Sequence, residues 1–536
     1  MRDWWRGSVT YQIYPRSFQD SNGDGIGDLP GITRRLPHVA SLGVDAIWLS
    51  PFFPSPMLDM GYDVSDYRGV HPDFGTLADF DKMLRVAHDL GLKVIIDQVL
   101  SHCAITHPLF AESRRDRTNA KADWFIWADP RPDGTPPNNW LSVFGGPAWT
   151  WDAGRRQFYM HHFLAGQPTF NFHNPAVQEY FLDVLRFWLD RGVDGFRLDT
   201  VNYYFHDVRL RSNPALPMAR PPINPYDMQD QIHTKTQPEN IGWLEKMRAL
   251  TDSYPDRMMV GEVGDALRGI EVMGKYTKGE KRLHMAYSFE MLGDAHSARF
   301  FRKTVESFFA GAPDGWPCWA FSNHDVPRHA GRWTGRGRIE DVAKQSAALL
   351  LSLEGSICLY QGEELGQTDT ELEYHELTDP KGLRFWPDEK GRDGCRTPMV
   401  WDESRHGGFT TGTPWLPVKP PQAARHVAAQ EARRDSVLHA YRDILAFRRA
   451  QKVLRRGQTR FLDLPEPILA FIRWLGKEEM LCIFNLGHEA VTLQIEGVEG
   501  SVGPDHHAEL DVTELRLGPN GYAWMHVGAD LALRVR

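Results

Sequence analysis

Acidic residues, most of them with histidine or arginine close by, follow short apolar runs at four places in this sequence. They are Asp97 and His102 in DQVLSH, Arg197 and Asp199 in GFRLDT, Glu262 in GEVG, and His324 and Asp325 in FSNHD. A single acid after an apolar strand is more often a helix cap than a catalytic group. Four such strand ends, three of them with histidine or arginine as well, favour one shared site. Carboxyl groups that meet in one site can serve as nucleophile and as general acid or base.

The spacing of Arg197 and Asp199 indicates what one of these carboxyl groups does. Side chains alternate along a strand, so these two residues point to the same side. A guanidinium beside a carboxylate stabilises its ionised form. We therefore expect Asp199 to be ionised, which suits a nucleophile and does not suit an acid that must hold a proton.

Residues at the ends of strands need a sheet that brings those ends together. Eight β-branched or aromatic runs occur, at Thr10–Tyr14, Ala46–Ser50, Lys93–Asp97, Gly195–Asp199, Met258–Glu262, His284–Phe289, Trp319–Asn323 and Ser356–Tyr360. Amphipathic stretches such as LADFDKMLRVAHDLG lie between them, which is typical of parallel βα units. Eight units predict an α/β fold, a (β/α)8 TIM barrel with its site at the carboxyl ends of the strands. A doubly wound open sheet is the alternative, but no glycine fingerprint follows the first run.

Two segments break the βα alternation. Residues 101–172 are rich in Pro, Gly, Asn and Trp and are too long for a plain loop, so they predict a small inserted domain after the third strand. From residue 456, alternating runs such as ILAFIRW and MLCIFNL predict a C-terminal antiparallel β-domain over 456–536. Residues 1–100 and 173–455 then form the barrel. Aromatic residues crowd into the insertion, either as a satellite core or as a stacking surface for flat ligands such as sugars.

The composition argues against several classes of protein. The chain has 61 Lys and Arg against 70 Asp and Glu residues, a net charge of −9, whereas a nucleic-acid-binding protein would be basic. No apolar run is long enough to cross a bilayer, and the first residues have no signal-peptide core. Five scattered cysteines form no disulfide pattern, so we expect buried thiols and a cytoplasmic protein. We expect no nucleic-acid or membrane partner, and a monomer or a dimer.

The four strand-end blocks, in this order, resemble the ordered sequence regions of the α-amylase superfamily, glycoside hydrolase family 13. The QIYPRSFQDSNGDGIGDL opening and the LGVDAIWLSPFFPSP segment are similar to that family too, so the resemblance covers nearly the whole chain. It implies a retaining glycosidase that needs no cofactor for catalysis. By this resemblance Asp199 is the nucleophile, Glu262 is the general acid and base with a raised pKa, and Asp325 is the acid that binds sugar hydroxyls.

The resemblance also implies a set of residues around the sugar ring that is cleaved. The positions that match the family's motifs are Asp59, Tyr62, His102, Arg197, His324 and Arg392. Arg396, from the same motif as Arg392, is the alternative for the arginine that closes this subsite. Phe144 and Phe163 are candidate aromatic walls from the inserted domain. Asp369 is a candidate for the neighbouring subsite, which would hold the leaving group.

A loop near the start of the chain carries oxygen-bearing side chains on alternate residues, with glycines between them. It is similar to the start of an EF-hand loop but has no glutamate at the twelfth position. The residues alone are also consistent with a turn that holds no ion. With the resemblance added, we expect a structural Ca²⁺ or Mg²⁺ bound by Asp20, Asn22, Asp24, the Ile26 carbonyl and Asp28. The pair His506–His507 has no further ligand at metal-site spacing, so it predicts no metal site.

The opening QDSNGDGIGDLPGI resembles exo-acting α-glucosidases and oligo-1,6-glucosidases more than endo-acting amylases. Thr200 matches a position where α-1,6-preferring enzymes of this subgroup tend to have Val and α-1,4-preferring ones Ala or Thr. Thr169 stands where the subgroup usually has Asp, which weakens any assignment from that block. The resemblance therefore implies a retaining exo-α-glucosidase for short α-1,4-linked glucosides, with maltose, sucrose and aryl α-glucosides as substrates, that works through a covalent β-glucosyl-enzyme and also transfers glucose.

Other functions use the same scaffold. A sucrose isomerase, a trehalose synthase or an oligo-1,6-glucosidase would use the same three acids, and the outcome would depend on what reaches the covalent intermediate first. A binding scaffold, as in the heavy chains of amino-acid transporters, would have lost catalytic acids and would carry a membrane anchor. Because Asp199, Glu262 and Asp325 are all present, the sequence favours an enzyme with a disaccharide or small oligosaccharide as its partner.

Overall fold

Eight short strands form one parallel sheet that closes into a barrel in the computed structural model, which describes residues 3–535. They are β1 Val9–Ile13, β2 Ala46–Leu49, β3 Lys93–Gln98, β7 Gly195–Leu198, β8 Met258–Val263, β9 Met285–Ser288, β10 Cys318–Trp319 and β11 Ser356–Tyr360. The order is β10-β11-β1-β2-β3-β7-β8-β9, and each neighbouring pair is parallel. A parallel bridge between Ala286 and Pro317 joins the two end strands. The predicted (β/α)8 barrel is confirmed.

The seventh strand, β10, is shorter than the sequence predicts, since it ends at Trp319 and not at Asn323. Asn323 Oδ1 accepts a hydrogen bond from the Asp325 amide at 2.8 Å, and Ser322 Oγ accepts one from the His329 amide at 2.8 Å. Such local hydrogen bonds from side chain to backbone compete with strand pairing. They turn the chain out of the sheet just before Asp325.

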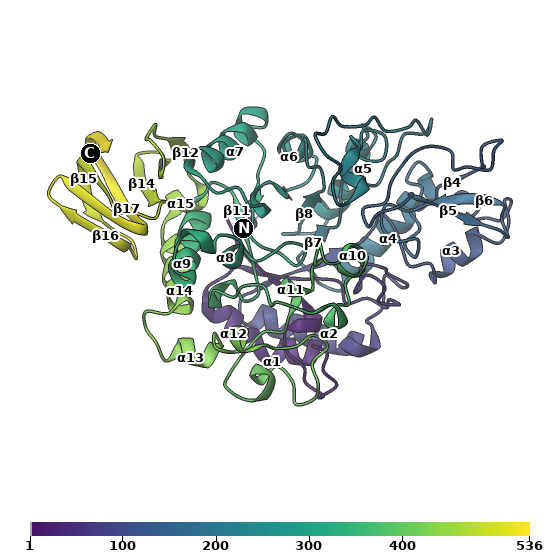
Figure 1. The fold of residues 1–536 in the computed structure, drawn as a ribbon, viewed down its shortest axis with the longest axis horizontal. Coiled ribbons are helices and arrows are strands. Elements are labelled where there is room, and N and C mark those ends of the chain that lie inside the picture. The colour runs from purple at the N-terminus through teal and green to yellow at the C-terminus, as the bar shows by residue number, and fades with distance from the viewer. Residues whose placement is uncertain (1–2, 536) are drawn as a thin grey trace.

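Helices surround the barrel (Figure 1). The longer ones are α1 Leu29–Leu42, α2 Leu77–Asp89, α4 Pro175–Asp190, α5 Asn240–Asp252, α6 Gly269–Thr277, α7 Ala298–Gly311, α9 Ile339–Ser352 and α14 Val437–Ala450. The shorter ones are α3 Pro108–Ser113, α8 His329–Arg332, α10 Pro380–Phe385, α11 Asp393–Arg396, α12 Pro420–Ala423, α13 Val427–Glu431 and α15 Lys452–Arg456. Side-chain caps explain where several begin: Asp28 caps α1, and Thr76 and Asp79 form a capping box on α2.

The alternation of side chains along the strands divides the core in two. Ile47 and Ile96 point outward and pack under the helices, in the largest buried cluster. Trp48 and Ile95 point inward and belong to a second cluster that fills the barrel. Asp97 follows Ile95 by two residues, so it points inward as well. The polar groups at the carboxyl ends of the strands therefore lie on an apolar floor.

The segment between β3 and β7 forms a small sheet beside the barrel. Its strands are β4 Trp127–Ala128, β5 Trp149–Asp152 and β6 Gln157–Met160, which pair antiparallel in the order β4-β6-β5. Trp140, Trp149 and Phe158 belong to a separate buried cluster here. Much of the aromatic crowding is therefore a satellite core, one of the two alternatives that the sequence leaves open. This sheet lies at the opposite end of the molecule from the C-terminal sheet (Figure 1).

A six-stranded sheet closes the chain. It consists of β12 Gln458–Phe461, β13 Ile468–Leu475, β14 Glu478–Asn485, β15 Val491–Ser501, β16 His506–Asp511 and β17 Glu514–Val535. The pairs β12–β13, β13–β14, β14–β17 and β16–β17 are antiparallel, and the sheet has its own apolar cluster. The predicted C-terminal antiparallel domain is confirmed, whereas the residue boundaries given for the domains stay predictions.

Two further expectations concern membranes and thiols. In residues 3–535, no helix combines the length and the apolar character that crossing a bilayer requires. The cysteines are free and buried, as expected; they are Cys103, Cys318, Cys358, Cys395 and Cys482.

Candidate active site

One cavity at the carboxyl ends of the barrel strands gathers most of the predicted residues. Its volume is about 340 Å³, which lies within the range of small-molecule sites. The predicted residues that line it are Asp59, Tyr62, His102, Phe144, Phe163, Asp199, Thr200, Glu262, Asp325 and Arg392. Arg197 and His324 are fully buried behind this lining and contact residues that belong to it.

Arg197 joins carboxyl groups from three neighbouring strands. Its Nη1 donates to Asp97 Oδ1 and Oδ2 at 2.9 and 3.0 Å and to Asp199 Oδ1 at 2.6 Å. Its Nη2 lies 2.6 Å from Glu262 Oε1, which also accepts a hydrogen bond from the Tyr287 hydroxyl at 3.0 Å. Charge-assisted bonds of this length hold both partners firmly. One buried guanidinium therefore fixes Asp199 and Glu262 beside each other.

Thr200 contacts the second oxygen of each of these carboxyl groups. Its amide donates to Glu262 Oε2 at 3.1 Å, and its hydroxyl donates to Asp199 Oδ2 at 3.2 Å. The backbone of Thr200 has a φ of 40°, in the left-handed region that a β-branched residue rarely adopts. Strained backbone of this kind concentrates at functional sites, where the surrounding structure enforces it.

The pKa values of Asp199 and Glu262 both lie above the ordinary values of these groups. Burial is the main cause, and Arg197 opposes it without outweighing it. Arg197 lowers the pKa of Asp199, as expected, but it is shared with the carboxyl groups of Asp97 and Glu262, and burial raises that pKa by more than Arg197 lowers it. The expected raised pKa of Glu262 agrees with the structure. Carboxyl groups this close titrate as a pair, so the pair holds a proton at a pH where isolated carboxyl groups have lost theirs.

Asp325 has the opposite electrostatic environment. Arg392 Nη1 and Arg396 Nη2 each lie 3.0 Å from its Oδ1. Burial alone would raise the pKa of Asp325, but His324, Arg392 and Arg396 lower it well below the usual range. Asp325 is therefore a permanently ionised hydrogen-bond acceptor at the edge of the cavity.

Arg392 spans one end of the cavity. Its Nη2 donates to Asp59 Oδ1 and to Asp379 Oδ1, at 2.7 Å each. Arg396 is fully buried and donates to the His324 carbonyl at 2.7 Å. Of the two alternatives from that motif, Arg392 is thus the one that lines the cavity, whereas Arg396 reaches it only through Asp325.

Aromatic and imidazole rings form the floor. The Tyr62 ring lies parallel to that of His324, with the centroids 5.1 Å apart and an interplanar angle of 7°. The Tyr62 hydroxyl donates to Asp97 Oδ2 at 3.0 Å. His102 Nε2 lies 2.8 Å from the Tyr62 carbonyl, which can only accept, so this nitrogen carries the proton. Burial lowers the pKa of His102 to about 4, so its ring is neutral at pH 7.

The insertion supplies one wall. The ring centroids of Phe144 and Phe163 lie 6.0 Å apart, and Phe163 stacks on Tyr203 at 5.8 Å. The guanidinium of Arg392 lies 5.1 Å from the ring centroid of Phe144. The second alternative for the aromatic residues, a surface for stacking flat ligands, therefore fits these two phenylalanines.

A further part of the cavity lining, which contacts Val143 and Phe163 of the insertion, was not expected from the sequence. Its residues are Tyr203, Asn224, Tyr226, Asp227 and Lys235. Buried Lys235 donates to the hydroxyls of Tyr203 and Tyr226 at 3.2 Å and to the Gly264 carbonyl at 2.6 Å. All five come from the connection between β7 and α5, residues 199–239, which is far longer than an ordinary βα loop. The unusual length of this connection could have indicated that it contributes to the site.

Asp369 does not lie at this cavity. Its Oδ1 accepts a hydrogen bond from the Arg328 amide at 2.7 Å, and the residue lines a different hollow. The expectation that it belongs to the neighbouring subsite is therefore wrong, since Asp369 is not among the residues that line the cavity.

The carboxylates of the acidic loop bind amides of their own turn. Those of Asp20, Asp24 and Asp28 accept hydrogen bonds from the chain around them; the donors are Ser21, Asn22, Gly23, Gly25, Ile26 and Gly31. Within residues 3–535, these three carboxylates do not bring one oxygen each within 4.8 Å of one another. The expected ligand set also contains Asn22 and the Ile26 carbonyl, so the bound Ca²⁺ or Mg²⁺ stays a prediction.

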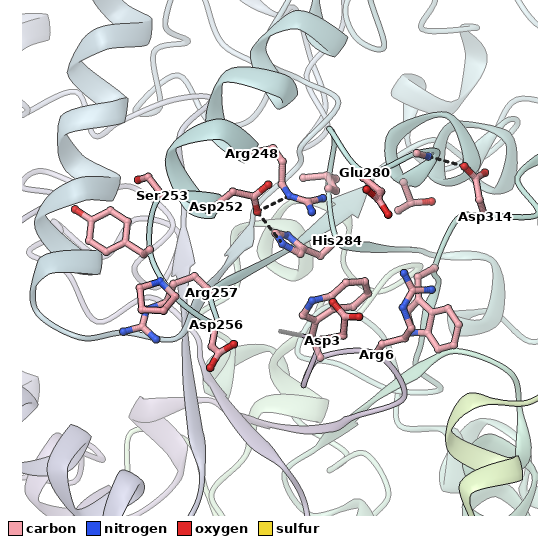
Figure 2. Close-up of a pocket in the computed structure, with 17 residues that line it drawn as sticks. Asp3, Arg6, Arg248, Asp252, Ser253, Asp256, Arg257, Glu280, His284 and Asp314 are labelled. Carbon is pink, nitrogen blue, oxygen red and sulfur yellow. Dashed lines mark hydrogen bonds and ion pairs between the residues drawn. The ribbon is translucent and has the colours of Figure 1, made fainter. Parts of the chain in front are cut away.

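A second and larger hollow, of about 1000 Å³, opens at the amino ends of the strands. Figure 2 shows its polar lining, in which Asp252 Oδ1 lies 2.7 Å from Arg248 Nε and 3.6 Å from His284 Nε2. None of the predicted site residues lines it. Since barrel enzymes carry their sites at the carboxyl ends of the strands, we assign the active site to the smaller cavity.

The chain is similar to proteins of known family. It matches the family described as alpha amylase, catalytic domain, over residues 12–457. A probable alpha-glucosidase of Rhizobium meliloti is 56% identical over 502 residues, which cover 92% of this chain and 91% of that protein. An oligo-1,6-glucosidase of Halalkalibacterium halodurans is 37% identical over 520 residues, with 90% of each chain covered.

Solved structures agree with these matches. An alpha-glucosyl transfer enzyme superposes with a TM-score of 0.95 at 51% identity and covers 98% of this chain and 99% of its own. The trehalulose synthase MutB of Pseudomonas mesoacidophila superposes with a TM-score of 0.87 at 31% identity, over 98% and 99% of the two chains. With its barrel, its cluster of buried acids and these relatives, the chain belongs to the α-amylase family, glycoside hydrolase family 13, and is a glycoside hydrolase of the α-glucosidase subgroup.

Proposed function

We propose that this chain is a retaining exo-α-glucosidase for short α-1,4-linked glucosides. Its substrates are maltose, sucrose and aryl α-glucosides, and it transfers glucose to other acceptors as well as to water. The observation that carries the proposal is the position of Arg197, which holds Asp199 and Glu262 beside each other. Carboxyl groups this close leave no room for a water molecule between them, so the substitution at the sugar proceeds in two steps and retains the configuration.

In the first step Asp199 attacks the anomeric carbon. Arg197 holds Oδ1 of Asp199, so Oδ2, whose partner is the Thr200 hydroxyl, is the oxygen that forms the bond. The glycosidic bond breaks, its electron pair stays on the leaving oxygen, and protonated Glu262 gives that oxygen a proton. The raised pKa of Glu262 supports this role, since a general acid must still hold its proton near neutral pH.

In the second step a water molecule attacks the anomeric carbon of the glucosyl-enzyme. Glu262, now a carboxylate, takes a proton from that water, and the bond from the sugar to Asp199 breaks. The product is α-glucose, and both carboxyl groups return to their starting protonation states. When a sugar or phenol hydroxyl takes the place of water, the same step transfers glucose.

The ionised groups at the end of the cavity near Asp325 and Arg392 support an exo mode of action. Asp325 accepts hydrogen bonds from sugar hydroxyls in all protonation states of the pair, because two arginines keep it ionised. Arg392 bridges to Asp59 at 2.7 Å and lies against Phe144. This bridge closes one end of the cavity, so the enzyme removes one terminal glucose at a time.

Thr200 lies where the leaving sugar meets the catalytic pair, since its amide and hydroxyl contact Glu262 and Asp199. Its hydroxyl faces the first leaving-group subsite and favours α-1,4 over α-1,6 links. Effects of this kind in a pocket are modest, about 1–3 kcal/mol.

We also propose that the enzyme works in the cytoplasm on small saccharides. Its five thiols are free and buried, which suits a reducing compartment. No metal or organic cofactor takes part in the two steps, because the protein's own carboxyl groups supply both the nucleophile and the proton.

Product analysis tests the proposal. Purified enzyme is incubated separately with maltose, isomaltose, sucrose and trehalose, with Asp199→Asn as the blank, and NMR records the anomer of glucose that appears first. We expect α-glucose from maltose and sucrose, little from isomaltose, and transfer products at high substrate concentration. Release of β-glucose would refute retention. Conversion of sucrose to a new disaccharide without net hydrolysis would make the enzyme an isomerase, as the structurally similar MutB is named a trehalulose synthase.

A further inference from the structure

Three potential metal ligands meet where the C-terminal sheet packs on the barrel. Asp341 lies in the first turn of α9, and His506 and His507 are the first two residues of β16. One carboxylate oxygen and one ring nitrogen from each histidine lie within 4.8 Å of one another. Elsewhere in the described range, 3–535, no set of three His, Cys, Asp or Glu side chains converges in this way. The spacing around His506 and His507 predicts no metal site, because Asp341 is 165 residues away from His506 in the sequence.

The hydrogen bond of His507 leaves one nitrogen ready to bind a metal. Its Nδ1 lies 3.0 Å from the carbonyl oxygen of Pro519. A carbonyl can only accept, so Nδ1 carries the proton and Nε2 carries a lone pair. Histidines that bind metals are usually oriented in this way, with the other ring nitrogen donating to a carbonyl or a carboxylate.

His506 and Asp341 already have the spacing of two ligands of one ion. His506 Nε2 lies 3.1 Å from Asp341 Oδ1. Two ligands bound at about 2.0–2.1 Å to a tetrahedral zinc ion are separated by a similar distance. An ion can take the place of the proton between them if that proton moves to Nδ1 of the same neutral ring, so no charge has to be created or lost.

The backbone of β16 is distorted so that both rings share one side. Successive residues of a strand normally point to opposite faces. His507 instead has a φ of 46°, in the left-handed region, and the register with β17 shifts between His506 and Ala508. The two rings consequently stack, with centroids 3.9 Å apart and an interplanar angle of 22°. Bulges that re-aim a side chain in this manner are common next to functional sites.

We propose that Asp341, His506 and His507 bind a zinc ion that ties the C-terminal domain to helix α9. Two imidazoles and one carboxylate suit Zn²⁺ and do not suit Ca²⁺ or Mg²⁺, which prefer oxygen ligands. Water completes the coordination, since His507 is exposed to solvent. Because the ligands come from the barrel and from the C-terminal sheet, bound zinc stabilises the folded chain by linking the two.

Isothermal titration of the tag-free, full-length protein with ZnCl₂ tests the proposal, with CaCl₂ and MgCl₂ as comparison ions. The variants are His507→Asn and Asp341→Asn: asparagine tolerates the left-handed backbone at residue 507 and keeps a hydrogen-bonding group at residue 341. His488→Ala is the matched control, since His488 is an exposed histidine of the same domain outside the cluster. Circular dichroism confirms that each variant is folded.

We expect one zinc site in the unmodified protein and in His488→Ala, at least about 10-fold weaker zinc binding in both cluster variants, and no site for calcium or magnesium. Zinc at a concentration well above Kd should raise Tm by about 2–4 °C in the unmodified protein and in the control only. Absence of zinc binding to the folded protein overturns the proposal. So does zinc binding that both cluster variants retain unchanged, since the ion would then be held elsewhere.

Discussion

At the amino ends of the barrel strands, Asp252 pairs with Arg248 at the surface of a hollow of about 1000 Å³ (Figure 2). At the carboxyl ends, Asp199 and Glu262 pair with Arg197 inside a cavity of about 340 Å³. The side chain of Asp252 is 49% exposed, whereas those of Asp199 and Glu262 are 7% and 3% exposed. Acidic residues thus pair with arginine at both ends of the barrel, but the acid at the amino end is far more exposed to solvent.

The pKa values respond to this difference with opposite signs. For Asp252, burial is too slight to outweigh His284 and Arg248, and its pKa is lowered. For Asp199 and Glu262, burial outweighs Arg197, and both pKa values are raised. Solvent screens exposed pairs, while a desolvated pair keeps its full electrostatic cost. The size of a hollow therefore says less about function than the burial of the charges in it.

The largest contrast is expected from removing one acid at each end. Asp199→Asn should lower kcat/KM for p-nitrophenyl α-glucoside at least about 10⁴-fold, because no group remains to form the covalent bond. Asp252→Asn, the matched control, should leave kcat/KM within about 2-fold. Initial rates and circular dichroism measure both. Residual activity above about 1% in pure, folded Asp199→Asn would remove Asp199 as the nucleophile.

Removing one arginine at each end should give a smaller contrast. Arg392→Ala leaves Asp59 and Asp379 without their shared cation and takes one of two arginines from Asp325. We expect kcat/KM to fall about 10²–10³-fold, because two or more charge-assisted hydrogen bonds are lost. Arg248→Ala should keep nearly full activity. Equal losses in the two variants would mean that the amino-end hollow takes part in function.

A still smaller effect tests specificity inside the cavity. Thr200→Val keeps the β-branch on the left-handed backbone and removes only the hydroxyl that contacts Asp199. The ratio of kcat/KM for isomaltose to that for maltose should rise about 5- to 50-fold. Thr200→Ser keeps the hydroxyl and should hold the original ratio. An unchanged ratio in Thr200→Val would show that linkage preference is set elsewhere in the cavity.

The smallest effect concerns stability. The folded-state pKa of Glu262 is raised, so between the ordinary pKa of a glutamate and neutral pH the folded chain binds more protons than the unfolded chain. Stability from this group is therefore complete at low pH and is lost as the pH rises through the folded pKa. Glu262→Gln should raise Tm by about 1–3 °C at pH 8 and leave it unchanged near pH 4.5. Scanning calorimetry measures both, and a lower Tm at pH 8 would contradict the prediction.

Local patterns were enough to predict the barrel and the three acids at its mouth. Alternation along β7 places Arg197 and Asp199 on one side, and the short apolar runs mark where strands end. These patterns depend on neighbours within a few residues, which the sequence displays directly. The third acid, Asp325, follows β10 closely. Its place at the cavity was therefore predicted correctly, although β10 is shorter than expected.

Other features depend on segments that meet only after folding. The wall around Lys235 comes from a long connection without a periodic pattern, and the cluster of Asp341, His506 and His507 joins two domains. In the acidic loop the spacing predicts a metal site, and only the structure shows that its carboxylates accept hydrogen bonds from nearby amides.

The sequence by itself determined that Asp199, Glu262 and Asp325 lie at the mouth of the barrel, because each follows a short apolar run that the sequence displays directly. Only the tertiary structure decided the protonation of those residues. Asp199 lies two residues from Arg197, which lowers its pKa as expected, yet all the contributions together raise that pKa. The cause is burial together with the charges of Asp97 and Asp325, which come from other strands. Burial and the charges of residues from other strands act on Asp199 only in the folded chain, since no single stretch of sequence contains all of these residues.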